Sequence, residues 1–364
     1  MSAGKELENL PNEIKDKIFL SLPMMILLKS RCVIRDYTRF HNPHFMKTHL
    51  NQQIEMDNGS TIIVTTASKI YKVNIDKFNS RIRLDFPFRN PTCTSPIILV
   101  SSCNGLLCLT HRGFYGEIMY LWNPATGDYK QLPEHVNDGI LYIRALGFGY
   151  DRISGKFKVL VISQRIPIQS EATVTVYTVG TSSWRSIGEV QYPVLELKQP
   201  QLFRGCPHWI VHSLKSIVSF GIGNEKFKKI PMPPIDNSMT KRTNLTALGG
   251  VLSIFCHLFK PDRFEMWLRA DDGSENTTWF KGFSLNESYI PRDYFADGYA
   301  IKLYGFKDGQ FLLRNNGPAL FDPLTRAVRG LRLRGEPKEF DVYSYVESLA
   351  MVTVEETGDV HQNS

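Results

Sequence analysis

The chain has 364 residues, of which 42% are hydrophobic and 22% charged, which excludes a disordered chain and suits either two domains or one large domain with a small additional module. Its 43 basic and 36 acidic residues are interspersed, so the net charge of +7 gives little indication of a nucleic-acid partner. No apolar run approaches the ~20 residues that cross a bilayer, and the polar N-terminus is no secretory signal, so we expect no membrane partner and a location in the cytoplasm and/or nucleus.

A first, helical domain is predicted over 1–50. Pro11 suits the first turn of a helix, and Pro23 ends that helix by forcing the preceding residue out of helical geometry. Ile14 and Ile18 lie on one face of it, four residues apart. A second apolar run and one more short helical turn complete the domain. So few residues rarely bury enough surface to fold alone, so these helices either cap the following domain or pack on a partner.

The motifs of this region follow one another in the order of a known family. They are Leu10-Pro11-Asn12-Glu13-Ile14, Ile18-Phe19, Leu22-Pro23, Leu27-Leu28, Arg31-Cys32-Val33, Asn42-Pro43-His44-Phe45 and His49-Leu50. The run resembles the F-box, whose pattern reads LPxEI, IL, LP, LL, RCV, PxF and HL. It departs from the family at Arg35-Asp36-Tyr37, where Lys-Ser-Trp is usual.

The resemblance implies that the apolar helix faces bind a Skp-type adaptor and, through it, a cullin and a RING subunit. The adaptor-binding residues that it implies are Leu10, Pro11, Ile14, Ile18, Leu22, Pro23, Leu27, Leu28, Cys32 and Val33.

The second domain, predicted over 51–350, consists of short strands separated by Gly, Pro, Asn and Asp. One hairpin pattern recurs six times, with an aromatic residue closing its first strand at spacings of 43 to 55 residues. These aromatic residues are Tyr71, Trp122, Tyr177, Phe220, Trp267 and Phe321. Three or four strands per period of about 50 residues is the size of a kelch-type blade. We therefore predict a mainly β protein, with N-terminal all-α helices and a β-propeller-like domain of about six blades.

This domain also carries recognisable motifs. They include SCNGLLC at 102–108, LWNPATG at 121–127, GFGYD at 147–151, SGKFKV at 154–159, PHW at 207–209 and YVESL at 345–349. Together they resemble the plant F-box-associated domain, which is kelch-like, over roughly 95–350. The remaining residues, 351–364, are polar towards their end and are predicted to form a disordered tail.

No catalytic or metal-binding set stands out, and no cofactor is expected. Asn123-Pro124 with Thr126-Gly127 predicts a hairpin turn, and Gly147-Phe148-Gly149 predicts a turn because it is too short for a phosphate loop. Cys206 and His208 would share one face of a strand, where a reactive thiolate is conceivable but a structural role is more common. The six cysteines are scattered, unlike those of a disulfide scaffold or a zinc site.

A basic segment near the end of the second domain carries Arg326, Arg329, Arg332 and Arg334. Its alternation of apolar and basic residues is most often a strand with one solvated face. The alternative is a rim that binds an acidic target protein.

The sequence thus predicts a non-catalytic substrate-recognition subunit of an SCF-type ubiquitin ligase, with an unidentified target protein. An adaptor-free interaction propeller with a degenerate F-box is the alternative. An S-locus F-box protein that recognises basic ribonucleases ranks lower because this chain is itself basic. A propeller enzyme is disfavoured because no acid, base or metal set converges.

Overall fold

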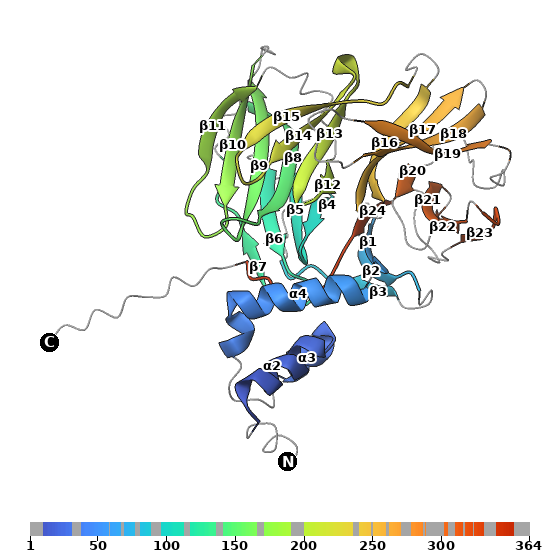
Figure 1. Cartoon of the computed structure of the whole chain (residues 1–364). Helices are drawn as coiled ribbons and strands as arrows, with labels where there is room; N and C mark the ends of the chain where they lie inside the picture. The colour runs from blue at the N-terminus through green and yellow to red at the C-terminus, as the bar shows by residue number, and fades with distance from the viewer. Residues whose placement is uncertain are drawn as a thin grey trace.

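Six β-sheets form a ring, and the N-terminal helices pack at one end of it (Figure 1). The computed structural model describes residues 10–30, 38–57, 59–66, 69–76, 81–88, 96–112, 117–135, 141–165, 171–190, 200–235, 240–248, 250–259, 262–270, 278–286, 288, 302–304, 310–315, 317–322, 324–330 and 340–352. The predicted disordered tail falls almost wholly outside these residues. Within them, no helix is long and apolar enough to cross a membrane.

The helical region contains α2 (Asn12–Ser21), α3 (Met24–Ser30), the 3-10 helix η1 (Thr38–His41) and α4 (Pro43–Asp57). α2 begins after Pro11, as predicted. The last helix is longer than the short turn that the sequence predicted. Asn42 caps it, because its side-chain oxygen accepts hydrogen bonds from the first amides, and Pro43 takes the first helical position. No glycine or proline then interrupts the helix before Asp57.

Each sheet has four antiparallel strands, which confirms the predicted propeller of about six blades. In sheet order, the first blade is β24 (Asp341–Ser344), β1 (Thr61–Thr65), β2 (Ile70–Asn74) and β3 (Arg81–Leu84). The second is β4 (Ile98–Cys103), β5 (Leu106–Arg112), β6 (Glu117–Trp122) and β7 (Tyr129–Gln131). The third is β8 (Leu141–Asp151), β9 (Lys156–Arg165), β10 (Ala172–Thr178) and β11 (Arg185–Val190).

The fourth blade is β12 (Gln201–Phe203), β13 (Cys206–Val211), β14 (Ser216–Gly221) and β15 (Lys226–Pro231), with the 3-10 turn η3 (His212–Leu214) between β13 and β14. The fifth is β16 (Thr240–Leu248), β17 (Val251–Phe259), β18 (Asp262–Arg269) and β19 (Trp279–Asn286). The sixth is β20 (Lys302–Tyr304), β21 (Phe311–Asn315), β22 (Gly317–Phe321) and β23 (Val328–Gly330).

The six recurring aromatic residues occupy equivalent places in the ring. They lie on β2, β6, β10, β14, β18 and β22, which are the third strands of their sheets. Five of the six are buried between blades, and Trp267 is partly buried. A single twisted sheet cannot bury both of its faces, so these aromatic side chains fill the space between one sheet and the next.

The two ends of the chain close the ring together. β24, from the C-terminal end, pairs antiparallel with β1, from the N-terminal end, with Val64 opposite Val342. The Tyr343 hydroxyl also donates a hydrogen bond of 2.5 Å to the carbonyl oxygen of Leu99 in the next blade. The first blade therefore forms only when both ends of the chain are in place.

A tryptophan contact recurs between blades. Trp184, just before β11, donates a hydrogen bond of 2.8 Å from its indole nitrogen to the carbonyl oxygen of Pro133, which follows β7. Trp279, at the start of β19, does the same at 2.8 Å to Pro231, at the end of β15. In both cases the outermost strand of one blade is tied to the outermost strand of the blade before it.

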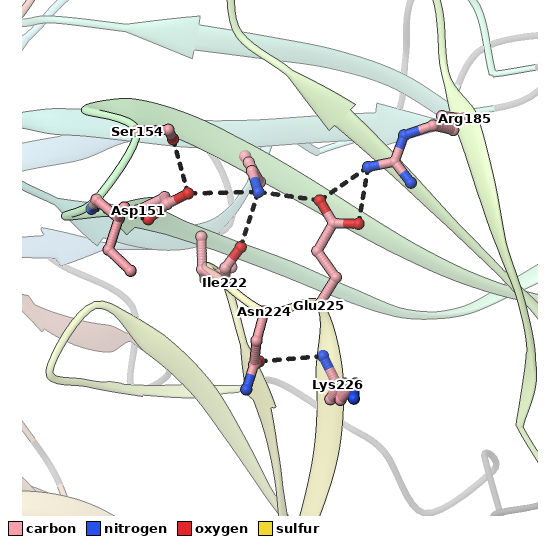
Figure 2. A network of polar contacts seen from close by, with 9 residues as sticks. Asp151, Ser154, Arg185, Ile222, Asn224, Glu225 and Lys226 are labelled. Carbon is pink, nitrogen blue, oxygen red and sulfur yellow. Dashed lines mark hydrogen bonds and ion pairs between the residues drawn. The ribbon is translucent and has the colours of Figure 1, made fainter.

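A network of charged side chains joins the third and fourth blades (Figure 2). The ammonium of Lys158, on β9, lies 2.9 Å from the Glu225 carboxylate and 3.5 Å from that of Asp151, and it donates to the Ile222 carbonyl oxygen at 3.0 Å. Arg185, on β11, contacts the other side of Glu225 at 2.7 Å. Because Lys158 is buried, these carboxylates and the carbonyl are what make its charge tolerable there.

The predicted turn at Gly147-Phe148-Gly149 is wrong, because these residues lie inside β8. Glycine is needed there for close approach between blades. A Cβ on Gly149 would clash with the carbonyl oxygen of Gly205, in the turn between β12 and β13. The paired glycines therefore mark a tight contact between sheets, which a single sequence does not distinguish from a turn. The hairpin turn predicted at 122–127 is confirmed.

Candidate functional site

The N-terminal helices have a small apolar core of their own. Phe19 on α2, Leu27 on α3, Phe40 on η1 and Phe45 on α4 are buried against one another. Phe19 and Phe40 meet edge to face, with ring centroids 5.4 Å apart. Arg39 lies beside this core, and its guanidinium donates to the Asp16 carboxylate at 2.7 Å. We call 12–30 and 38–57 together the helical module.

The helical module also presents apolar side chains to solvent. Ile14 on α2 is 45% exposed, and Met25 and Ile26 on α3 are 52% and 48% exposed. Pro11 and Pro23, which bound α2, are exposed as well. Figure 1 shows α2 and α3 on the side of α4 away from the propeller. Side chains of this size are stabilised by about 1.5–3 kcal/mol when fully buried, so this surface is suited to contact with another protein.

The residues predicted to bind an adaptor fall into three groups. Pro11, Ile14 and Pro23 are exposed, and Leu10, Ile18, Leu22 and Leu28 are partly buried. Leu27 has no exposed surface and belongs to the core of the helical module. Cys32 and Val33 lie outside the described residues, as does the divergent segment Arg35-Asp36-Tyr37.

Met25 and Ile26 were not among the predicted residues, although they are the most exposed apolar side chains of α2 and α3. Helix α3 begins Met-Met-Ile-Leu-Leu, so its first five residues are all apolar. A run without polar residues gives no periodicity, and periodicity is the signal that separates a buried helix face from an exposed one.

The predicted basic rim is described only in part. Arg326 lies in the turn between β22 and β23, and Arg329 lies on β23, while Arg332 and Arg334 fall outside the described residues. The turn that carries Arg326 joins the third and fourth strands of its blade. The equivalent turn of the second blade packs against the helical module through Ala125. Arg326 therefore lies at the end of the ring that faces the helices.

Cys206 and His208 do not form the geometry of a nucleophile and its base. The Nδ1 atom of His208 lies 2.9 Å from the backbone carbonyl oxygen of Cys206, to which it donates a hydrogen bond. Burial lowers the pKa of His208 to about 4 and raises that of Cys103, Cys108 and Cys256 to about 12. These buried thiols are therefore protonated at neutral pH. Across the described ranges, no three His, Cys, Asp or Glu side chains gather as metal ligands would.

Comparison with known proteins agrees with this architecture. Residues 57–305 match the F-box associated beta propeller domain. The chain belongs to this family. Among relatives from Arabidopsis thaliana, the F-box protein At3g07870 is 26% identical, covering 80% of this chain and 76% of its own length. The F-box protein CPR1 is 22% identical, covering 95% and 89%, and the F-box/kelch-repeat protein At3g23880 is 23% identical, covering 89% and 93%. The resemblance to a plant F-box protein with an F-box-associated domain is thereby confirmed.

Proposed function

We propose that this chain is the substrate-recognition subunit of an SCF-type ubiquitin ligase in the cytoplasm or nucleus. The observation that supports this most is the exposed apolar surface of α2 and α3, centred on Ile14, Met25 and Ile26. In an F-box protein, this surface is available to bury against a Skp-type adaptor. The adaptor would link the chain to a cullin and a RING subunit, which hold the ubiquitin-conjugating enzyme.

The propeller would then hold a target protein. The turns that join the second and third strands of each blade lie at the end of the ring opposite the helical module, because strand direction alternates within every sheet. Loops on a rigid scaffold are common binding sites, and these face away from the adaptor surface. The chain itself would form no covalent intermediate. It would act by raising the effective concentration of target lysines near the conjugating enzyme.

Co-expression with a plant Skp-type adaptor tests this proposal. We expect the two chains to co-elute as a stoichiometric complex. Ile14→Asp and Ile26→Asp should each weaken the complex roughly 10- to 100-fold, which corresponds to the loss of one buried side chain. The matched control is Ile153→Asp, since Ile153 is 95% exposed in the turn between β8 and β9 of the propeller.

The co-expression experiment also distinguishes the ligase proposal from its alternative, an interaction propeller that binds no adaptor. A folded chain that forms no complex would refute the ligase proposal and favour an adaptor-free interaction propeller. A complex that tolerates both substitutions on α2 and α3 would show that the adaptor binds elsewhere on the chain.

A further inference from the structure

The segment 345–352, which follows the last strand, ties three parts of the molecule together. Tyr345 is buried between the first two blades, and Val352 is buried between the second and third. Leu349, between them in sequence, is 2% exposed and packs in the core of the helical module. We call 345–352 the C-terminal strap.

Hydrogen bonds hold the strap against the second blade. The side-chain amide of Asn123 donates to the carbonyl oxygens of Ser348, at 2.9 Å, and Ala350, at 2.8 Å. The Ser348 hydroxyl donates to the Asn104 carbonyl oxygen at 2.7 Å. The strap lies so close to the turn between β4 and β5 that a Cβ on Gly105 would collide with Ser348. These contacts leave the strap little freedom to move relative to the propeller.

The turn that holds the strap also contacts the helices. The carbonyl oxygen of the Asn123 side chain accepts a hydrogen bond of 3.0 Å from the Ala125 amide, which fixes the turn between β6 and β7. Ala125 then packs against the core of the helical module. One buried side chain, Asn123, therefore organises the strap and the β6–β7 turn, which supply Leu349 and Ala125 to the core of the helical module.

The geometry points to Leu349 as a positioning residue that fixes the helical module in one orientation on the propeller. The other fully buried members of its cluster, within the described residues, come from α2, α3, η1 and α4. Leu349 is thus the propeller's buried contribution to a core that is otherwise helical. Without it, Ala125 and the hydrogen bonds from Thr61, on β1, to the Asp57 carboxylate at the end of α4 would remain, and small interfaces between domains permit relative motion.

This inference deepens the proposed function and rests on it for its consequence. If the helical module binds an adaptor and the propeller binds a target, Leu349 sets the distance and angle between them. A fixed angle concentrates the target near the conjugating enzyme, whereas a loose connection spreads it over a larger volume.

Distance measurements on the full chain test the positioning role without an adaptor. Nitroxide labels on non-natural amino acids at Lys17, on α2, and Lys226, on β15, avoid the native cysteines, and both sites are exposed. Double electron–electron resonance should give one narrow distance distribution for the parent chain. Leu349→Asp should broaden the distribution about twofold or more, and Leu349→Met should restore it.

Two further variants separate positioning from simple unfolding. Asn123→Ala removes the hydrogen bonds that hold the strap, substitutes no residue of the helical core, and should also broaden the distribution. Leu324→Asp, at a residue that is 91% exposed in a propeller turn, is the matched control and should not. Hydrogen exchange should show α2 and α4 amides still protected in every variant. Narrow distributions in both Leu349→Asp and Asn123→Ala would overturn the inference, as would broadening that occurs only with loss of that protection. Failure of adaptor binding would instead refute the proposed function.

Discussion

Lys158→Met removes the central cation between the third and fourth blades while keeping most of the side-chain volume. The ammonium of Lys158 neutralises Glu225 and Asp151 and satisfies the Ile222 carbonyl oxygen. Removing one partner of a buried ion pair typically costs 3–5 kcal/mol, because the remaining charge is left uncompensated. Arg185 still reaches Glu225 in the variant. We therefore expect the lower end of that range, a loss of about 3 kcal/mol in the free energy of unfolding.

The pH dependence of this loss tests its electrostatic origin. Burial alone would raise the pKa of Glu225, but hydrogen bonds from Arg185 and Lys158 outweigh it and lower the pKa. The pKa of Asp151 is lowered mainly by the hydrogen bond from Ser154. A lowered folded-state pKa stabilises the fold above the unfolded value and loses that contribution as the pH falls. The gap between the parent and the variant should therefore shrink as the pH falls through the carboxylate range.

Denaturant unfolding of the parent and of Lys158→Met, near pH 7 and near pH 4.5, would measure the loss in the free energy of unfolding at each pH. Lys156→Met is the matched control, because Lys156 lies two residues away on the same strand and is exposed. We expect it to change the free energy of unfolding by less than about 0.5 kcal/mol. A Lys158→Met variant as stable as the parent at neutral pH, or a loss that is constant with pH, would refute this account of the network.

Three further predictions concern other contacts, each measured by equilibrium unfolding. Gly149→Ala should cost about 3 kcal/mol, because its Cβ would strike a backbone carbonyl of the next blade. Gly282→Ala should cost less, because its Cβ would be too close only to the Leu268 side chain, and equal costs would contradict this. Burial lowers the pKa of His49, so the free energy of unfolding should fall as the pH drops below 6.5. His49→Gln should make the free energy of unfolding less dependent on pH in this range, and an unchanged pH dependence would contradict the prediction. Trp184→Phe and Trp279→Phe should each cost about 1 kcal/mol for one lost hydrogen bond, and a neutral result would show that these bonds do not stabilise the ring.

The architecture of the propeller could be predicted because its signals are local and repeated. An aromatic residue such as Tyr177 or Phe220 closes the third strand of its sheet, and a polar turn follows it before the outermost strand. Six copies of this pattern give the blade number without knowledge of any contact between blades. The start of α2 after Pro11 could be predicted for the same reason, because the proline that signals it is adjacent in sequence.

The contacts between blades and modules could not be predicted, because their partners lie far apart in the sequence. Lys158 lies between Phe157 and Val159 on β9, and nothing near it in the sequence indicates that its partner is Glu225 in the next blade. Leu349 lies in the YVESL motif, which identifies the end of the domain but gives no sign that this leucine packs beside Phe19. The predicted adaptor-binding residues stay a prediction, and α3 offers no polar residue in its first turn to show which of its faces is exposed.

These long-range contacts give the two ends of the chain a common role. β24 completes the first blade by pairing with β1, and the strap that follows it completes the core of the helical module with Leu349. A helical module of this size rarely folds alone, so its stability comes partly from Leu349, which lies about three hundred positions away in the sequence. Contacts of such separation form late because closing the long loop costs entropy. A fully packed helical module would therefore accompany a finished propeller, and a chain with an open ring would carry the proposed adaptor surface on incompletely packed helices.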